Sequence, residues 1–196
     1  MDAIVRMLLL LQTNPPRAWG AFPLQAGTLE ARRLVSLEPG AYVLIVSAPS
    51  GAGVVLGEVY PVGESIFRNV SVLSQLASGS VTTVGFRMSE GTNGRDVLLR
   101  VAGPSLGQFA IKDVVSDPQL DLWDNSQRLI GRNTGYSSAL GMSAVSTFSA
   151  YGAFPFLPGA NDAALMAQLY PGNYTAQVRS VTGRPGTVVV EIYSPD

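Results

Sequence analysis

Short segments in which apolar and polar residues alternate cover most of the chain and predict β-strands. In residues 174–179 the polar side chains of Thr175, Gln177 and Arg179 alternate with apolar ones, the pattern of a half-buried strand. The apolar runs 54–60 and 187–193 each predict a strand packed on both faces. The spacing of apolar residues in 137–149 predicts a short helix or an ordered loop. The predicted strands are 33–37, 42–47, 54–60, 67–73, 81–88, 96–102, 119–123, 128–131, 165–169, 174–179 and 187–193.

A stretch of the sequence occurs twice. The offset between the two copies is 132 residues (154 − 22) and becomes 133 after one inserted residue. The matched motifs are Gly20-Ala21-Phe22-Pro23 with Gly152-Ala153-Phe154-Pro155, Pro39-Gly40-x-Tyr42 with Pro171-Gly172-x-Tyr174, and Glu58-Val59-Tyr60 with Glu191-Ile192-Tyr193. Each copy contains three predicted strands joined by Pro-Gly and Gly-rich turns, so we interpret the pattern as a duplication of half a β-sandwich.

The two copies lie in segments of unequal content. Residues 64–196 hold an upstream half followed by one copy of the repeated half, whereas residues 1–63 hold the repeated half alone. The sequence therefore predicts an all-β protein. We expect a jelly-roll-like antiparallel β-sandwich with an additional duplicated half-sandwich at the N-terminus and at most one or two short helices. The lone half needs a partner to pack against.

Several turn and core motifs resemble those of the bacterial pre-peptidase C-terminal β-sandwich. They are Asp117-Pro118-x-Leu120-x-Leu122-Trp123-Asp124, Arg128-Leu129-Ile130-Gly131-x-Asn133 and Pro171-Gly172-x-Tyr174. Asn69-Val70-Ser71 and 97–106 further resemble a repeat of large secreted proteins of environmental bacteria. The resemblance covers 64–196 and, as a half repeat, 20–60. It implies a jelly-roll-like sandwich, export from the cell, and a role as an accessory or surface module. The lone N-terminal half departs from that family.

Composition argues against an enzyme and against a nucleic-acid-binding protein. The chain has neither His nor Cys, so a Ser-His-Asp triad and a thiol nucleophile are excluded. Lys112 is the only lysine, and no convincing pair of carboxylates stands out. The formal net charge of −1 offers no basic footprint for nucleic acid. No apolar run reaches the roughly 20 residues that a membrane-spanning helix needs.

The N-terminal segment is a candidate subunit contact. Its apolar residues could form an extended strand donated to a neighbouring subunit, or a helix with one apolar face. Docking within the same chain is the alternative to docking on a neighbour. The candidate contact residues are Ile4, Val5, Met7, Leu8, Leu9, Leu10 and Leu11.

Two further groups of residues are candidate ligand sites. Asp117, Asp121, Asp124 and Asn125 offer oxygen atoms of the kind that calcium prefers, although Asp and Asn are also common turn formers, and the sequence favours a solvated turn. Calcium is the only cofactor that the sequence raises. Trp19 and Trp123, with Tyr136 and Tyr151, could provide flat apolar surfaces for stacking sugars, whereas a role in the core is commoner for aromatic residues.

These observations favour a non-catalytic extracellular structural protein. We expect a self-associating subunit of a filament or surface assembly, forming a homo-oligomer or homopolymer at the cell surface, because the lone half repeat and the apolar N-terminus both need covering. The alternative is a carbohydrate- or matrix-binding accessory module of a secreted bacterial protein, with a polysaccharide as its partner.

Overall fold

The computed structural model describes residues 5–10, 31–46, 54–60, 67–88 and 93–194, without the side chains of 5–10, 31–34 and 142. The chain divides into two compact units, Met1–Phe67 and Arg68–Asp196. The repeat pattern placed this division after residue 63.

The described part of the N-terminal unit contains a three-stranded sheet. Its strands are β1 (Val5–Leu10), β2 (Ala31–Leu34) and β3 (Val55–Tyr60), in the order β2-β1-β3. Both neighbours of β1 run parallel to it, with Leu9 opposite Arg33 and Val59. Of the strand and the helix considered for the N-terminal segment, residues 5–10 form the strand, and that strand pairs within its own chain. Ile4 and Leu11 lie outside the described residues.

Two expectations for this unit are wrong. The segment predicted as a strand over 42–47 has no strand in its described residues 42–46. Strand β3, whose copy in the other unit is packed on both faces, is exposed at Val55 and Val59. The reason is shared: a strand needs a hydrogen-bonded neighbour, and an apolar strand face needs a second layer. The described residues of this unit supply no neighbouring strand to 42–46 and no second layer to the apolar face of β3, which pairs only with β1.

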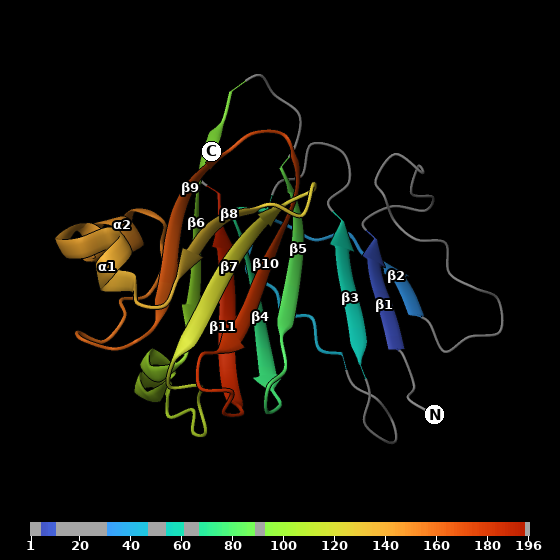
Figure 1. Cartoon of the computed structure of the whole chain (residues 1–196). Helices are drawn as coiled ribbons and strands as arrows, with labels where there is room; N and C mark the ends of the chain where they lie inside the picture. Colours follow the sequence, from blue (N-terminus) through green and yellow to red (C-terminus); the bar gives the residue numbers. More distant parts are fainter. Residues whose placement is uncertain (1–4, 11–30, 47–53, 61–66, 89–92, 195–196) are drawn as a thin grey trace. The chain divides into compact units, whose positions relative to one another are not determined.

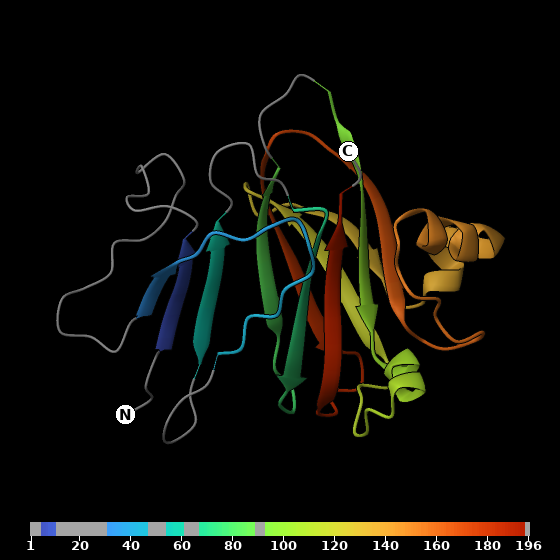
Figure 2. The ribbon, with the colours of Figure 1, turned by 180° about the vertical axis from the view of Figure 1, so that it is seen from behind.

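The second unit is a β-sandwich of two four-stranded sheets, as predicted, and every strand pair in both sheets is antiparallel. Figure 1 shows one sheet in front of the other, and Figure 2 shows the same layers from behind. The first sheet has the order β5 (Thr82–Met88), β10 (Gly172–Ser180), β7 (Pro118–Asp124) and β8 (Leu129–Asn133). The second has the order β4 (Asn69–Leu76), β11 (Gly186–Tyr193), β6 (Arg95–Ala102) and β9 (Ala163–Leu169).

Alternating side chains of these strands build two hydrophobic cores. Val97, Leu99 and Val101 of β6 point between the sheets, into a core that also contains Leu120 and Val178. On the other face of β6, Leu98 and Ala102 belong to a second core with Phe148. Strand β6 is therefore buried on both faces, because one side meets the opposite sheet and the other meets the helical segments.

Short helices complete the second core. They are η2 (Pro104–Phe109), α1 (Tyr136–Leu140), η3 (Gly141–Ser143) and α2 (Ala144–Ala150). The last three occupy the segment in which the sequence predicted a short helix or an ordered loop. Phe148 packs edge-on against Phe156 at 4.9 Å between ring centroids, and Tyr136 contacts both rings. Among the described residues of this unit, the helical segments pack on the sheet that contains β6, and no described helix packs on the outward positions of the sheet β5-β10-β7-β8.

Positions matched by the sequence repeat make the same side-chain hydrogen bonds in both units. The Tyr42 hydroxyl donates to the carbonyl of Glu38 at 2.7 Å, and the Tyr174 hydroxyl donates to the carbonyl of Tyr170 at 2.9 Å. Likewise Tyr60 donates to the Glu58 carboxylate at 3.1 Å, as Tyr193 does to Glu191 at 2.8 Å.

Candidate functional site

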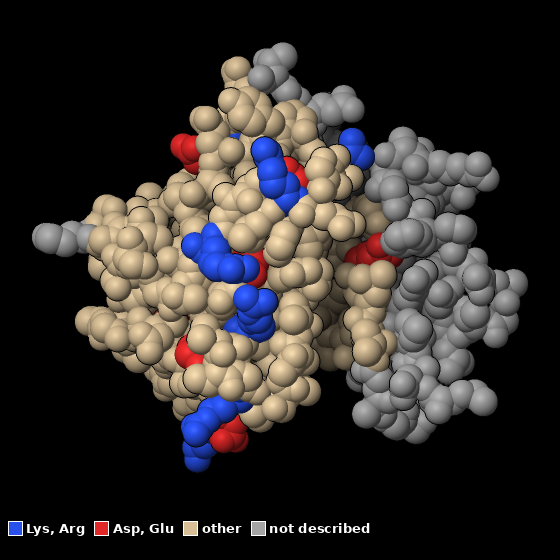
Figure 3. All heavy atoms as spheres, viewed as in Figure 1, with Lys and Arg blue, Asp and Glu red and all other residues tan. Residues whose placement is uncertain are grey.

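The uncovered surface of the sheet β5-β10-β7-β8 is the candidate binding site of the second unit, and we call it the outer face. Core residues such as Val84, Leu122 and Ala176 point inward, so their neighbours along each strand point outward. Figure 3 shows basic side chains gathered over this sheet. The outward positions include Thr83, Gly85 and Arg87 on β5, Asn173, Thr175, Gln177 and Arg179 on β10, Gln119, Asp121 and Trp123 on β7, and Arg132 and Leu129 on β8.

Asp121 is the centre of the polar network on the outer face. Arg132 donates to its two carboxylate oxygens at 2.6 and 2.9 Å, and Arg179 approaches it at 3.8 Å. The side-chain amide of Gln119 donates to both oxygens as well, at 2.9 and 3.1 Å. Burial alone would raise the pKa of Asp121, but these hydrogen bonds and the two nearby positive charges outweigh it and lower the pKa below 3.8.

The exposure of these charges is uneven. The Asp121 side chain is 4% exposed, whereas the Arg132 and Arg179 side chains are each 46% exposed. The negative charge therefore lies on the floor of the sheet, and the guanidinium groups lie above it, toward solvent. A ligand that approaches this region meets donors and positive charge first.

Trp123 lies in the neighbouring row of the outer face. It is half-buried, opposite Thr175, and Thr175 lies opposite Gly85. A Cβ atom added at Gly85 would meet no atom within 4 Å, so the surface beside Thr175 is open. The indole Nε1 of Trp123 is buried and has no hydrogen-bond partner among the described residues. The apolar ring is therefore the part of Trp123 available to a ligand.

The other aromatic residues predicted for sugar stacking do not join Trp123. Tyr136 is buried in the second core and donates its hydroxyl to the carbonyl of Leu157 at 3.1 Å. Tyr151 packs against the same core. Trp19 lies outside the described residues. The predicted platform is therefore not assembled from Tyr136 and Tyr151, because the amphipathic helical segments need large side chains to fill the second core.

The carboxylates predicted as calcium ligands are engaged by donors of the protein itself. Asp117 accepts hydrogen bonds from the Ser180 hydroxyl at 2.7 Å and the Thr182 amide at 2.9 Å. Asp124 accepts from the backbone amides of Ser126 and Arg128, each at 3.0 Å, and Asn125 lies in the same turn. In the described ranges, no three acidic side chains gather where they could hold a metal ion. Calcium binding stays a prediction.

A buried charge pair lies beneath the helices. The Arg100 Nε donates to Glu191 at 2.9 Å, and its Nη1 donates to the carbonyl of Phe154 at 2.6 Å. The guanidinium also lies over the rings of Phe148, Phe154 and Phe156, at 4.3–4.6 Å from their centroids. Because Arg100 is fully buried and paired, this network belongs to the protein interior and offers no exposed group to a ligand.

Neither Arg132 nor Gly85 was predicted from the sequence as a member of the outer face. Alternation on β10 pointed to Thr175, Gln177 and Arg179, but only the cross-strand register brings Arg132 opposite Asp121. The buried pair was missed too. A signal for it exists in the sequence, because Arg100 and Glu191 each interrupt an apolar run.

An open cleft of about 420 Å³ lies near the start of β11, and its lining includes Gln75, Asp113, Ser116 and Arg184.

In the part of the chain that the structure describes, no helix is both long and apolar enough to cross a membrane.

Comparison by sequence finds no matching protein family and no matching curated protein. Comparison of structures finds the pre-peptidase C-terminal domain of a collagenase from Bacillus anthracis, with 12% identity, a TM-score of 0.40, and coverage of 63% of this chain and 88% of that one. It also finds PliG, a periplasmic inhibitor of g-type lysozyme from Aeromonas hydrophila, with 11% identity, a TM-score of 0.40, and coverage of 65% and 87%. The Yersinia pseudotuberculosis-derived mitogen matches with 9% identity, a TM-score of 0.41, and coverage of 67% and 89%. No activity, ligand or partner of these proteins is transferred to this chain.

Proposed function

We propose that this chain is a non-catalytic extracellular protein that self-associates through its N-terminal unit, as a subunit of a filament or surface assembly. The observation that carries the proposal is the exposed apolar surface of that unit. Support for a non-catalytic role comes from composition, since the chain lacks His and Cys. The extracellular location rests on the resemblance of its motifs to those of secreted bacterial sandwiches.

The most exposed apolar side chains of the described N-terminal unit lie at and next to segments matched by the repeat. Val43 is 86% exposed, Ile45 is 79% exposed and Val54 is 74% exposed. In the other copy, the positions of Val43 and Ile45 are held by the polar residues Thr175 and Gln177. At these positions the other copy exposes polar side chains to water, whereas the N-terminal copy exposes apolar ones. Exposed apolar residues at such positions indicate a surface that a partner covers.

Apolar side chains of β3 in the same unit are also exposed. Val55 and Val59 are each 40% exposed, whereas Val188 and Ile192, which the repeat matches to them, are buried in the sandwich core. We propose that the partner is a second copy of the chain, because every copy carries the same exposed apolar surface. Docking on a different surface of the next copy repeats into a filament, whereas docking on the same surface closes a dimer.

The test compares the full chain with a Val43→Asp/Ile45→Asp variant by analytical ultracentrifugation and negative-stain microscopy. We expect the wild type to form dimers or filaments and the variant to remain monomeric, because two charges would be buried in the contact. The matched control is Val145→Asp/Val181→Asp, which changes exposed valines of the other unit, 67% and 56% exposed. A wild-type chain that is monomeric at high concentration, or equal assembly in all three proteins, contradicts the proposal.

The second candidate function is a carbohydrate- or matrix-binding accessory module. The outer face favours it, because a flat sheet surface bearing Trp123, Thr175, Asn173 and Gln177 offers an apolar ring beside hydrogen-bonding side chains. Such a combination suits ligands that have both hydroxyl groups and apolar ring faces.

A further inference from the structure

The position between β2 and β3, which β1 fills in the structure, is the subject of this inference, and we call it the slot. We infer that self-association exchanges the N-terminal strand between copies of the chain. The strand of a second copy enters the slot antiparallel to β3 and brings its Arg6 opposite Glu58. The inference rests on the proposed self-association and names the segment that the copies exchange.

The slot corresponds to the place of β6 in the second unit. The sequence repeat matches β2 with the start of β9 and β3 with β11, and β6 lies between β9 and β11 as β1 lies between β2 and β3. The cross-strand rows agree as well. Two rows that the repeat matches are Arg32-Leu8-Glu58 and Ala164-Arg100-Glu191. The middle strand therefore sits in the same register in both units.

The two middle strands run in opposite directions. Strand β6 is antiparallel to both of its neighbours, whereas β1 is parallel to both of its own. Parallel pairing is slightly less stable per residue, and parallel sheets occur almost only where both faces are covered. On β3, Val55, Leu56 and Val59 are each 40% exposed. An antiparallel strand is therefore the better occupant of the slot.

The N-terminal segment resembles β6 in sequence. Residues 2–7, Asp-Ala-Ile-Val-Arg-Met, match residues 96–101, Asp-Val-Leu-Leu-Arg-Val, with Asp first, Arg fifth and apolar residues elsewhere. Arg6 thus corresponds to Arg100. In the parallel register of the structure, Arg6 lies opposite Leu56. A strand that runs through the slot as β6 runs through its sheet places Arg6 opposite Glu58 instead.

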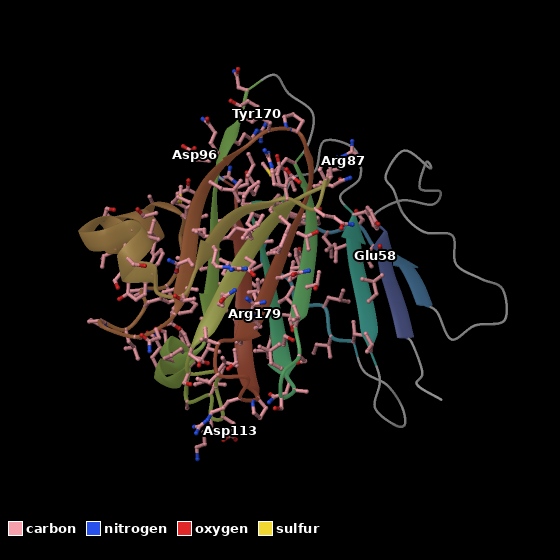
Figure 4. The ribbon with its side chains drawn as sticks, in the orientation of Figure 1. Glu58, Arg87, Asp96, Asp113, Tyr170 and Arg179 are labelled. Atoms are coloured by element: carbon pink, nitrogen blue, oxygen red, sulfur yellow. The ribbon has the colours of Figure 1, made fainter. Side chains whose placement is uncertain are left out.

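The second unit shows which interactions the exchanged strand forms. There, Glu191 accepts hydrogen bonds from Arg100 at 2.9 Å and from the Tyr193 hydroxyl at 2.8 Å. In the N-terminal unit, Glu58 accepts the corresponding hydrogen bond from Tyr60 at 3.1 Å, and Figure 4 shows Glu58 on β3. The carboxylate is thus held as its counterpart is, and the donated strand supplies the arginine.

A second copy is the source of the antiparallel strand. The chain's own strand fills the slot in the parallel direction, whereas a strand from another chain can enter in either direction. Exchange replaces one strand by another of identical sequence, which makes it a low-cost route to assembly. Each chain donates one strand and offers one slot. Two chains that exchange strands with each other close a dimer, and a chain that donates to the next one extends a filament.

The test introduces pairs of cysteines into the full chain, which has none of its own. Val5→Cys/Val59→Cys reports the antiparallel register, in which these positions correspond to the pair Leu99 and Ile192. In the parallel register Val5 lies opposite Val55, four residues (59 − 55) or about 13 Å along β3 from Val59, which is too far for a disulfide.

Two further variants are the controls. Val5→Cys/Val55→Cys reports the parallel register of the structure. Val5→Cys/Val145→Cys places the second cysteine at an exposed valine of the other unit and measures chance encounters. All three proteins are oxidised with copper–phenanthroline and separated by size on non-reducing gels.

We expect Val5→Cys/Val59→Cys to form disulfide-linked dimers or higher oligomers. The yield should exceed that of Val5→Cys/Val145→Cys at least about tenfold, because the exchanged contact holds the two thiols at a high effective concentration. The inference is overturned if Val5→Cys/Val59→Cys forms its disulfide within one chain, if it forms none, or if the Val145 control links chains equally well.

Charge reversal tests the ion pair without cysteine. Glu58→Arg should weaken self-association at least about tenfold, because the exchanged Arg6 would lie between Arg32 and another arginine. Adding Arg6→Glu should bring self-association back to within about threefold of the wild type. Glu38→Arg, at an exposed position of the same unit, should stay within about twofold of the wild type. Analytical ultracentrifugation measures all four proteins. A double variant no better than Glu58→Arg, or an equal loss in Glu38→Arg, contradicts the pair.

Together, sedimentation and cross-linking separate this inference from the proposed function. If the wild type self-associates but Val5→Cys/Val59→Cys gives no disulfide between chains, strand exchange is refuted and self-association stands. If the wild type is monomeric at high concentration, both are refuted.

Discussion

At the scale of single residues, the strongest test of the fold is the buried pair of Arg100 and Glu191. A guanidinium among three phenylalanine rings is stable only because Glu191 and the Phe154 carbonyl accept its hydrogen bonds. Glu191 in turn depends on Arg100, since its other described donor is the Tyr193 hydroxyl. Removing one partner leaves the other buried without its counter-charge.

We expect Arg100→Met to lower the free energy of unfolding by about 3–5 kcal/mol, the usual cost of breaking a buried ion pair. The measurement is urea unfolding followed by circular dichroism. Arg95→Met is the control, because Arg95 is exposed at the start of the same strand, and it should change stability by less than about 0.5 kcal/mol. Adding Glu191→Leu to Arg100→Met should restore part of the loss. A double variant less stable than Arg100→Met would refute this account of the pair.

At the scale of elements, the entry into η2 depends on close approach of two backbone segments. Gly103, the residue before the helix, has no room for a side chain, because an added Cβ would lie 2.2 Å from the carbonyl oxygen of Val115. Asp162 holds the same turn by accepting hydrogen bonds from the amides of Gly103 and Ser105, at 2.7 and 3.1 Å. Backbone cannot yield as a flexible side chain can, so the contact fixes the identity of this residue.

Gly103→Ala should therefore destabilise the second unit by about 1–3 kcal/mol or more, the cost of overpacking. Gly107 lies in the same helix, and a Cβ there would meet no atom within 4 Å. Gly107→Ala should leave stability unchanged or raise it slightly, because alanine restricts the unfolded chain. Thermal unfolding of both variants measures the difference. Equal melting temperatures would show that the Val115 segment moves freely, which would count against the tight turn.

The sequence predicted a strand correctly where the pattern of apolar and polar residues within that one segment was sufficient to indicate it. Alternation located β10, and the apolar run with Glu191 located β11 as a strand buried on both faces. No strand forms over the described part of 42–47, although its sequence matches that of β10. In the second unit, β10 lies between β5 and β7 and pairs with both, and 42–46 has no such neighbours among the described residues. Sequence pattern reports a preference for strand, whereas a strand also needs neighbours, and these come from distant parts of the chain.

In the candidate site too, local sequence pattern indicated single residues, whereas their partners come from distant parts of the chain. Trp123 was a candidate for sugar stacking and Asp121 a candidate calcium ligand, but the surroundings of both depend on partners on β8 and β10. Asp121 was considered as a calcium ligand, since a carboxylate in a sequence does not reveal that Arg132 lies opposite it. Cross-strand pairing in this sheet joins residues up to 96 positions apart (178 − 82), and no short-range pattern encodes that register.

At the scale of the whole molecule, the fold shifts the pKa values of aspartates, which titrate in acid, and of tyrosines, which titrate in alkali. Hydrogen bonds from Ser180 and Thr182 outweigh the opposing effect of burial at Asp117, and the backbone amide of Arg128 is the largest influence on Asp124. Both pKa values lie below 3.8, like that of Asp121. Burial and the charge of Glu58 raise the pKa of Tyr60 to about 12, and burial with the charge of Glu191 raises that of Tyr193.

The sequence has neither His nor Cys, whose side chains titrate near neutral pH. Together with the pKa shifts above, this predicts a free energy of unfolding that stays nearly constant from about pH 5 to about pH 9. Below it, the unfolded chain binds more protons than the folded one, so stability falls as the pH drops through the lowered aspartate values. Above about pH 10, the folded chain retains tyrosine protons that the unfolded chain releases, so stability falls as the pH rises. Urea midpoints measured across this range test the profile. Tyr193→Phe should flatten the alkaline limb and leave the acid limb unchanged, whereas a step in stability between pH 6 and 8 would contradict the assignment of titrating groups.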